Sequence, residues 1–230
     1  MTTWLSVVIP VKDGSQYLGE AVTSALGQRP RPGEVIVVDD GSSDDSAAVA
    51  AAFGDGVQVI PAVGRGAAAA RNTGVAAARG EMIAFLDADD RWTAAALSHL
   101  VLALKTDDDA VLSHGRVREF RSPELSPSIA ARLEPRPGAP HGVISGSFLF
   151  IASIFDQVGP LDTDLRAGEV VDWLARLRVL GMKETSTEAV VLERRLHAGH
   201  LRPHKREAQV DLIRVVRAGL DRQRPVPTAP

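Results

Sequence analysis

Apolar and polar positions along the first half of the chain alternate between two patterns. Short continuous apolar runs predict buried strands at residues 5–10, 34–38, 57–61, 81–86 and 110–114. Between them, apolar residues recur at helical spacing over residues 15–27, 45–53, 65–79 and 93–104. Because this alternation is typical of βαβ units, we expect an α/β fold with a mostly parallel central sheet and helices on both faces.

The second half of the chain is less regular. Residues 116–142 hold several prolines and few apolar residues in series, which predicts a long loop. Beyond it we expect a strand or strand–turn over residues 144–154, a helix over 168–181, a strand over 189–196 and a last helix over 203–220. The pattern therefore predicts a single domain over residues 1–202 and a helical C-terminal extension over residues 203–230.

Composition narrows the class of protein. The 230 residues are 45% hydrophobic and 24% charged, which suits one ordinary domain with a sizeable core. The sequence contains no cysteine, which excludes disulfides, thiolate catalysis and cysteine-ligated metal sites. The net charge of −3 argues against a dedicated nucleic-acid binder. The sequence shows neither a signal-peptide pattern nor an apolar run of ~18–20 residues, so we expect a cytoplasmic protein.

Acidic side chains follow three of the predicted strands. Asp13 comes after the first strand, Asp40 after the second, and Asp87 and Asp89 after the fourth. Ligands of parallel sheets bind at the carboxyl ends of the strands, so these acids are expected on one rim. Asp87 and Asp89 point to the same side of an extended chain and form a hard-oxygen pair suited to Mg²⁺ or Mn²⁺. The alternative is that each acid only closes a turn or caps the next helix.

A glycine-rich segment from Gly64 to Gly74 leads into the third predicted helix. Glycines let the backbone approach a ligand closely, and a helix N-terminus favours anions. Arg71 lies among small residues, where its side chain is free to reach a phosphate or a base; the alternative is a solvated arginine. No Gly-Lys-Ser/Thr sequence follows, so the segment is not a P-loop.

In this order, these segments resemble the GT-A glycosyltransferases, specifically the inverting family 2. The resemblance rests on residues 6–13, 34–44, 70–74 and 80–92, and it covers residues 4–104 densely. It implies a GT-A, Rossmann-like fold. It also implies that residues 1–115 bind a nucleotide-sugar donor, with uridine diphosphate as the expected nucleotide, and that residues 116–202 bind the acceptor.

The same resemblance implies roles in donor binding. It places the stretch from Pro10 to Asp13 along the base and ribose pocket, with Asp40 on the base and Arg71 beside it. The full donor-binding set is Pro10, Val11, Asp13, Asp40, Arg71, Asp87 and Ala88.

A divalent cation, Mn²⁺ or Mg²⁺, is the cofactor that the resemblance implies. Asp89 would contact it most directly, with Asp87 beside it. The sequence Arg194-Arg195-Leu196-His197 resembles a late family element near the donor diphosphate. His197 is therefore a further candidate metal ligand, and its alternative is a structural histidine.

Residues 168–181 are similar to the acceptor-side helix of the family. Glu169, Asp172 and Trp173 fit its pattern, but Val170 stands where the family usually has the aspartate that acts as general base. Glu169 and Asp172 are three residues apart and share a helix face, so either is a candidate base. The alternative is that both acids have no catalytic role and lie near the helix N-terminus because the helix dipole favours negative charge there.

The reaction implied is metal-dependent, inverting transfer of a sugar to an unknown acceptor hydroxyl by direct displacement. One alternative is a non-catalytic sugar-nucleotide or carbohydrate-binding protein with the same fold. Val170 supports this alternative, because it replaces the acid that usually serves as the base. Another is a nucleotidyltransferase, which is disfavoured because no glycine-rich basic loop follows the first strand.

Charge is distributed unevenly. Residues 194–230 carry a net charge of +6 and residues 1–193 a net charge of −9. Three roles stay open for the basic tail: contact with the donor diphosphate, peripheral contact with an anionic membrane, and docking on the domain or on a second subunit of a homodimer. Four apolar residues at helical spacing would serve the last two roles, namely Leu212, Ile213, Val216 and Leu220.

Overall fold

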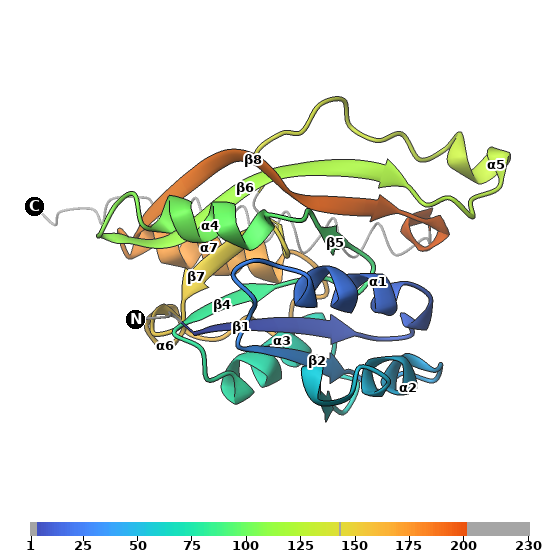
Figure 1. The fold of residues 1–230 in the computed structure, drawn as a ribbon, viewed down its shortest axis with the longest axis horizontal. Coiled ribbons are helices and arrows are strands. Elements are labelled where there is room, and N and C mark those ends of the chain that lie inside the picture. The colour runs from blue at the N-terminus through green and yellow to red at the C-terminus, as the bar shows by residue number, and fades with distance from the viewer. Residues whose placement is uncertain (1–3, 143, 202–230) are drawn as a thin grey trace, which may run out of the picture.

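A computed structural model describes residues 4–142 and 144–201 of the chain (Figure 1). Within them, one sheet contains strands β1 (Leu5–Val11), β2 (Glu34–Asp39), β3 (Gln58–Pro61), β4 (Met82–Phe85), β5 (Arg91–Trp92), β6 (Ala110–Arg121), β7 (Phe148–Ile151) and β8 (Lys183–Leu196). The α-helices are α1 (Ser15–Leu26), α2 (Ser46–Ala51), α3 (Ala67–Ala77), α4 (Ala96–Leu104), α5 (Pro127–Ala130), α6 (Ile154–Val158) and α7 (Glu169–Val179). Two 3₁₀ turns complete the order, η1 (Gly54–Gly56) and η2 (Ala198–Leu201).

The strand order across the sheet is β3-β2-β1-β4-β7-β6-β8-β5. The first four strands in this order run parallel, and β6 and β8 are also parallel to each other. The pairs β4–β7, β6–β7 and β5–β8 are antiparallel. The predicted α/β fold with a mostly parallel sheet is therefore confirmed, and the β1, β2 and β4 strands direct their carboxyl ends to one edge.

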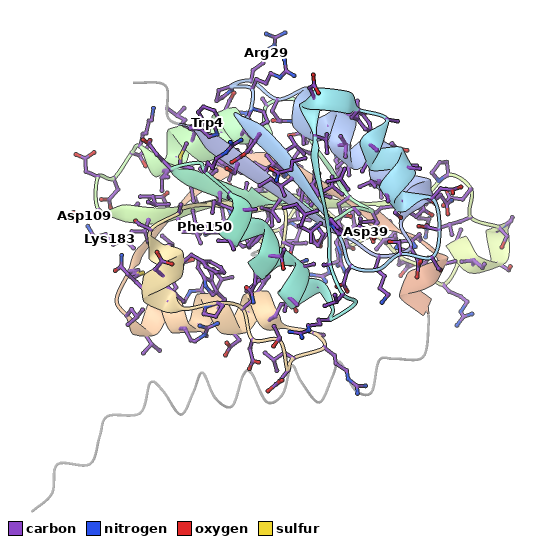
Figure 2. All side chains as sticks on the ribbon, turned by 90° about the horizontal axis from the view of Figure 1, so that it is seen from below. Trp4, Arg29, Asp39, Asp109, Phe150 and Lys183 are labelled. Carbon is purple, nitrogen blue, oxygen red and sulfur yellow. The ribbon has the colours of Figure 1, made fainter. Side chains whose placement is uncertain are left out.

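Every residue of β1 is buried, because the sheet is covered on both faces. Val7 and Ile9 pack in one apolar cluster with residues of α1, α2 and α4. Val8 packs in the other cluster with residues of α3, α6 and α7. Alternation of side chains along the strand supplies both cores. Figure 2 shows Phe150 of β7 inside the molecule, where it belongs to the second cluster.

The prediction of a long loop over residues 116–142 is wrong for residues 116–121, which form a strand. Strand β6 continues to Arg121 across residue 115 and pairs with β8 along this length. The sequence does not indicate a strand here because the side chains are charged rather than apolar. In the fold these charges pair across the strands: Arg118 contacts Glu193, and Arg194 contacts Glu119. Strand β8 also begins earlier than predicted, at Lys183.

The predicted C-terminal helix over residues 203–220 lies outside the described residues, as do the membrane, docking and dimer contacts expected of it. Within residues 4–142 and 144–201, no helix is both long enough and apolar enough to cross a membrane.

Candidate functional site

A pocket of about 1090 Å³ opens at the carboxyl ends of β1, β2 and β4. It is the edge at which the sequence places its acidic clusters. Every predicted donor-binding and metal-binding residue lines it, namely Pro10, Val11, Asp13, Asp40, Arg71, Asp87, Ala88, Asp89 and His197. The two candidate bases, Glu169 and Asp172, are not among the lining residues.

The carboxylates in the turns after β1 and β2 are held by hydrogen bonds from neighbouring turns that are distant in the sequence. Asp40 is buried, and its two oxygens accept the N–H groups of Arg65 and Gly66 at 2.9 and 2.8 Å. Gly66 has a φ of 93°, which favours glycine at the residue before α3. Asp13 accepts the backbone N–H and hydroxyl of Ser43, and these bonds lower the pKa of the Asp13 carboxyl. Both turns are thus fixed before any ligand enters.

Arg71 of α3 joins the pocket to helix α7. Its guanidinium donates to Asp87 at 2.5 Å and to Glu169 at 2.6 Å, and only 5% of its side chain is exposed. Burial acts to lower the pKa of Arg71, but the two carboxylates raise it above its ordinary value. Burial raises the pKa of Asp87 more than Arg71 lowers it. Among the hydrogen bonds of the described residues, the buried Nε of Arg71 has no partner.

The acidic loop after β4 is held by Arg195 of β8, a residue to which the sequence assigned no role of its own. The Arg195 side chain is 2% exposed and donates to the Asp89 carbonyl at 3.0 Å. Its backbone N–H donates to Asp90 at 2.8 Å. Burial, followed by the charges of Asp89 and Asp87, raises the pKa of Asp90 to about 8. The loop therefore concentrates carboxylates that repel one another in the absence of a nearby cation.

The donor set of the site fits a divalent cation that is shared with a ligand. His197 Nε2 lies 3.0 Å from Asp89 Oδ2, which brings a nitrogen and an oxygen ligand together. Within residues 4–142 and 144–201, no three acidic or histidine side chains are gathered closely enough to hold a metal by themselves, and Asp87 is turned toward Arg71. Mg²⁺ usually takes one or two protein carboxylates and completes its shell with phosphate oxygens. Asp89 suits that arrangement as the carboxylate, and His197 adds a nitrogen atom beside it.

The two candidate bases have different surroundings. Asp172 is buried, and its Oδ2 accepts Arg176 Nε at 2.9 Å, one turn further along α7. Glu169 stands at the first position of α7, and only Arg71 separates it from the pocket-lining Asp87. Val170 packs in the apolar cluster below the sheet. Glu169 is thus connected through Arg71 to the carboxylates that line the pocket, whereas Asp172 is paired within its own helix.

Residues 124–129 supply a wall of the pocket that sequence reasoning missed. Glu124, Leu125, Ser126 and Ile129 line it, next to residues of α1 that include Tyr17. The only signal for this wall in the sequence is the length of the loop predicted over residues 116–142, which is typical of functional lids or disordered segments. No motif in the segment identifies residues 124–129 themselves.

Comparison with known proteins supports a single family. The sequence profile of the family described as Glycosyl transferase family 2 matches residues 6–152. The chain is 32% identical over 206 residues to the succinoglycan biosynthesis protein ExoU of Rhizobium meliloti, covering 79% of this chain and 58% of that protein. It is 28% identical over 213 residues to the uncharacterized glycosyltransferase RP339 of Rickettsia prowazekii, covering 84% of this chain and 64% of that protein. The chain spans less than two thirds of the length of these relatives.

Two solved structures have the same fold. The mannosyltransferase PcManGT of Pyrobaculum calidifontis, in complex with GDP-Man and Mn²⁺, superposes with a TM-score of 0.76 at 16% identity, covering 100% of this chain and 66% of that chain. TarS 1-349 of S. aureus, in complex with UDP-GlcNAc, gives a TM-score of 0.75 at 16% identity, covering 98% of this chain and 68% of that chain. These likenesses confirm the GT-A, Rossmann-like fold.

Proposed function

The chain belongs to glycosyltransferase family 2, and we propose that it transfers a sugar from a nucleoside-diphosphate donor to an acceptor hydroxyl. The observation that carries the proposal is the pocket at the sheet edge, where nine donor-binding and metal-binding residues predicted from scattered motifs lie together. UDP is the nucleotide we assign to it. The solved structures with this fold carry UDP-GlcNAc in TarS and GDP-Man in PcManGT, so both UDP and GDP belong in the test.

Asp89 and His197 are the residues we assign to a divalent cation, Mn²⁺ or Mg²⁺. Such a cation, when bound, neutralises the charge of a departing nucleoside diphosphate. Asp13 and Asp40, held by their turns, would present a fixed surface to the base and ribose. In this proposal residues 1–115 provide most of the donor pocket, and residues 124–129 and His197 complete it. The rest of residues 116–202 provides the acceptor side.

Glu169 is the residue we assign as general base in an inverting displacement. The acceptor oxygen forms a bond to the anomeric carbon, the bond from that carbon to the phosphate oxygen breaks, and the nucleoside diphosphate leaves with the electron pair. The acceptor proton goes to Glu169. Arg71 contacts Glu169 through Oε1, and Oε2 is the oxygen we assign to that proton. Geometry of this kind tightens when substrate binds.

The test is a calorimetric binding measurement of UDP and GDP with and without Mn²⁺, followed by an assay of donor hydrolysis. We expect one nucleotide to bind more tightly with Mn²⁺, and Asp89→Asn to remove this metal dependence. Asp109→Asn, which changes an exposed carboxylate distant from the pocket, is the control and should behave as the unaltered chain. Absence of any nucleotide binding would overturn the proposal.

A non-catalytic sugar-nucleotide-binding protein is the second candidate. The observation that favours it is the burial of Val170 at the usual position of the base, together with the absence of both candidate bases from the pocket lining. Metal-dependent nucleotide binding without any donor hydrolysis or transfer would decide for this candidate.

A further inference from the structure

The wall formed by residues 124–129 has few attachments to the rest of the molecule. Its α5 helix projects at one end of the molecule, beyond the ends of β6 and β8 (Figure 1). The hydrogen bonds given for residues 125–129 in the described chain are local, such as Leu125 N–H to Ser122 and Ile129 N–H to Ser126. Beyond the far end of the wall, the Leu133 carbonyl accepts Arg121 Nε at 2.7 Å. The contact that holds the wall toward α1 lies at its beginning.

Glu124 provides that attachment. Its Oε1 accepts the hydroxyl of Tyr17 and, at 3.2 Å, the side-chain amide of Gln16, both on α1. Its Oε2 accepts the Ser122 hydroxyl at 2.6 Å. The carboxylate thus joins the first turn of α1 to a segment more than one hundred residues further along the chain. These are charge-assisted bonds, which are stronger than bonds between neutral groups.

Tyr17 is itself held in place from the other side. The Arg195 guanidinium lies 4.6 Å from the centre of the Tyr17 ring, a cation–π distance. The His197 ring meets the Tyr17 ring edge-on at 5.2 Å between centroids. The Tyr17 hydroxyl, at the far end of this ring, donates to Glu124. Tyr17 therefore links the proposed metal side of the pocket to the wall.

We propose that Glu124 is a positioning residue: through Tyr17 it fixes residues 124–129 as a wall that encloses the bound donor. This inference rests on the proposed function for the identity of the ligand. Leu125 and Ile129 give the wall an apolar surface in a pocket that Asp87 and Asp89 also line. Loss of the Glu124 contacts leaves the wall held only by its backbone connections and by the Arg121–Leu133 hydrogen bond beyond it, and we expect the pocket to open to solvent.

The experiment uses the full chain and the variants Glu124→Ala, Tyr17→Phe and the double variant. Trypsin cleavage after Arg132 reports how often the wall opens, since cleavage follows the population of the open form. We expect about 3- to 10-fold faster cleavage in each single variant, as befits the loss of a hydrogen bond. The double variant should cleave no faster than the faster single variant, because both remove the same contact. UDP or GDP affinity should fall by a similar factor.

Three controls separate positioning from general destabilisation. Glu124→Gln keeps a carbonyl oxygen for the Tyr17 hydroxyl and should restore slow cleavage and nucleotide affinity. Asp109→Ala breaks an exposed ion pair with Lys183 at the end of the molecule opposite α5 and should change neither (Figure 2). Thermal unfolding should shift little in any variant, because Glu124 is exposed.

Two outcomes would overturn the inference: cleavage of Glu124→Ala no faster than that of Asp109→Ala, or faster cleavage with unchanged nucleotide affinity. If the unaltered chain binds neither UDP nor GDP, that result contradicts the proposed function and not the role of Glu124. The trypsin comparison then still decides whether Glu124 holds the wall.

Discussion

The Glu169 carboxylate lies 2.6 Å from the Arg71 guanidinium, although the two residues are 98 positions apart in the sequence. Arg71 also contacts Asp87 at 2.5 Å, so one buried cation connects the acid of α7 with the acidic loop of the pocket. This contact distinguishes the two candidate bases, because Asp172 pairs instead with Arg176 of its own helix.

Glu169→Gln is expected to lower sugar transfer by about 10²–10⁴-fold, the usual contribution of a general base, while nucleotide affinity stays unchanged. Asp172→Asn is the matched variant, three residues further along α7. It should lower stability by roughly 1.5–3 kcal/mol, because Arg176 loses a charged acceptor, and should leave the rate of transfer by the folded protein nearly intact. Turnover assays and urea denaturation measure the two effects. A loss of turnover confined to Asp172→Asn would reverse the assignment.

Arg71→Met should destabilise the fold by about 3–5 kcal/mol, because Asp87 and Glu169 lose the buried cation that they share and must either stay charged without a partner or take up a proton. Arg79→Met is the control, since the Arg79 side chain is 73% exposed where it pairs with Glu34. That change should cost at most about 1 kcal/mol. Denaturant unfolding of both variants gives the comparison, and equal losses would contradict the structural role of Arg71.

Gly74→Ala tests the close packing of α3 on β1. A Cβ at Gly74 would lie 2.2 Å from Val8 Cγ1, a buried side chain in the sheet. The expected loss is about 1–3 kcal/mol, since overpacking displaces the helix or the strand. Gly19→Ala in α1 is the control, because its Cβ would lie 4.0 Å from Val49, an ordinary contact. It should be neutral or stabilising, as alanine is a better helix former. Thermal unfolding separates the two.

Asp44 gives a prediction for acid stability. Burial acts to raise its pKa, but hydrogen bonds from Ser46 and Ser15 outweigh it and lower the pKa to about 2. A carboxyl with a lowered folded-state pKa stabilises the protein above its unfolded pKa, and this stabilisation is lost as the pH falls from about 4 toward 2. The stability difference between the unaltered chain and Asp44→Asn should therefore shrink over that range.

The matched variant for this effect is Asp45→Asn, which changes an exposed neighbour whose side chain makes no cap hydrogen bond. Its stability shows how much the loss of an exposed charge before α2 changes stability by itself. Because Asp44 is exposed, solvent screens the effect and it should be small. A pH-independent difference for Asp44→Asn would contradict the lowered pKa.

Local sequence patterns were sufficient for the donor side of the pocket. Asp13, Asp40 and Asp89 each follow a strand whose apolar run is readable in isolation, and parallel strands bring their carboxyl ends to one edge. Patterns were insufficient for β6 beyond residue 115, because its charged side chains find their partners on β8 and on other distant segments such as Arg136.

The sequence by itself determined the α/β architecture and the residues that gather at the rim, because the spacing of apolar side chains dictates which elements form and where each strand ends. Only the tertiary structure decided the partners of those residues. Arg71 contacts Glu169, and Tyr17 contacts Glu124, through side chains that meet across distant elements. Such contacts depend on packing geometry in three dimensions, which no local pattern encodes.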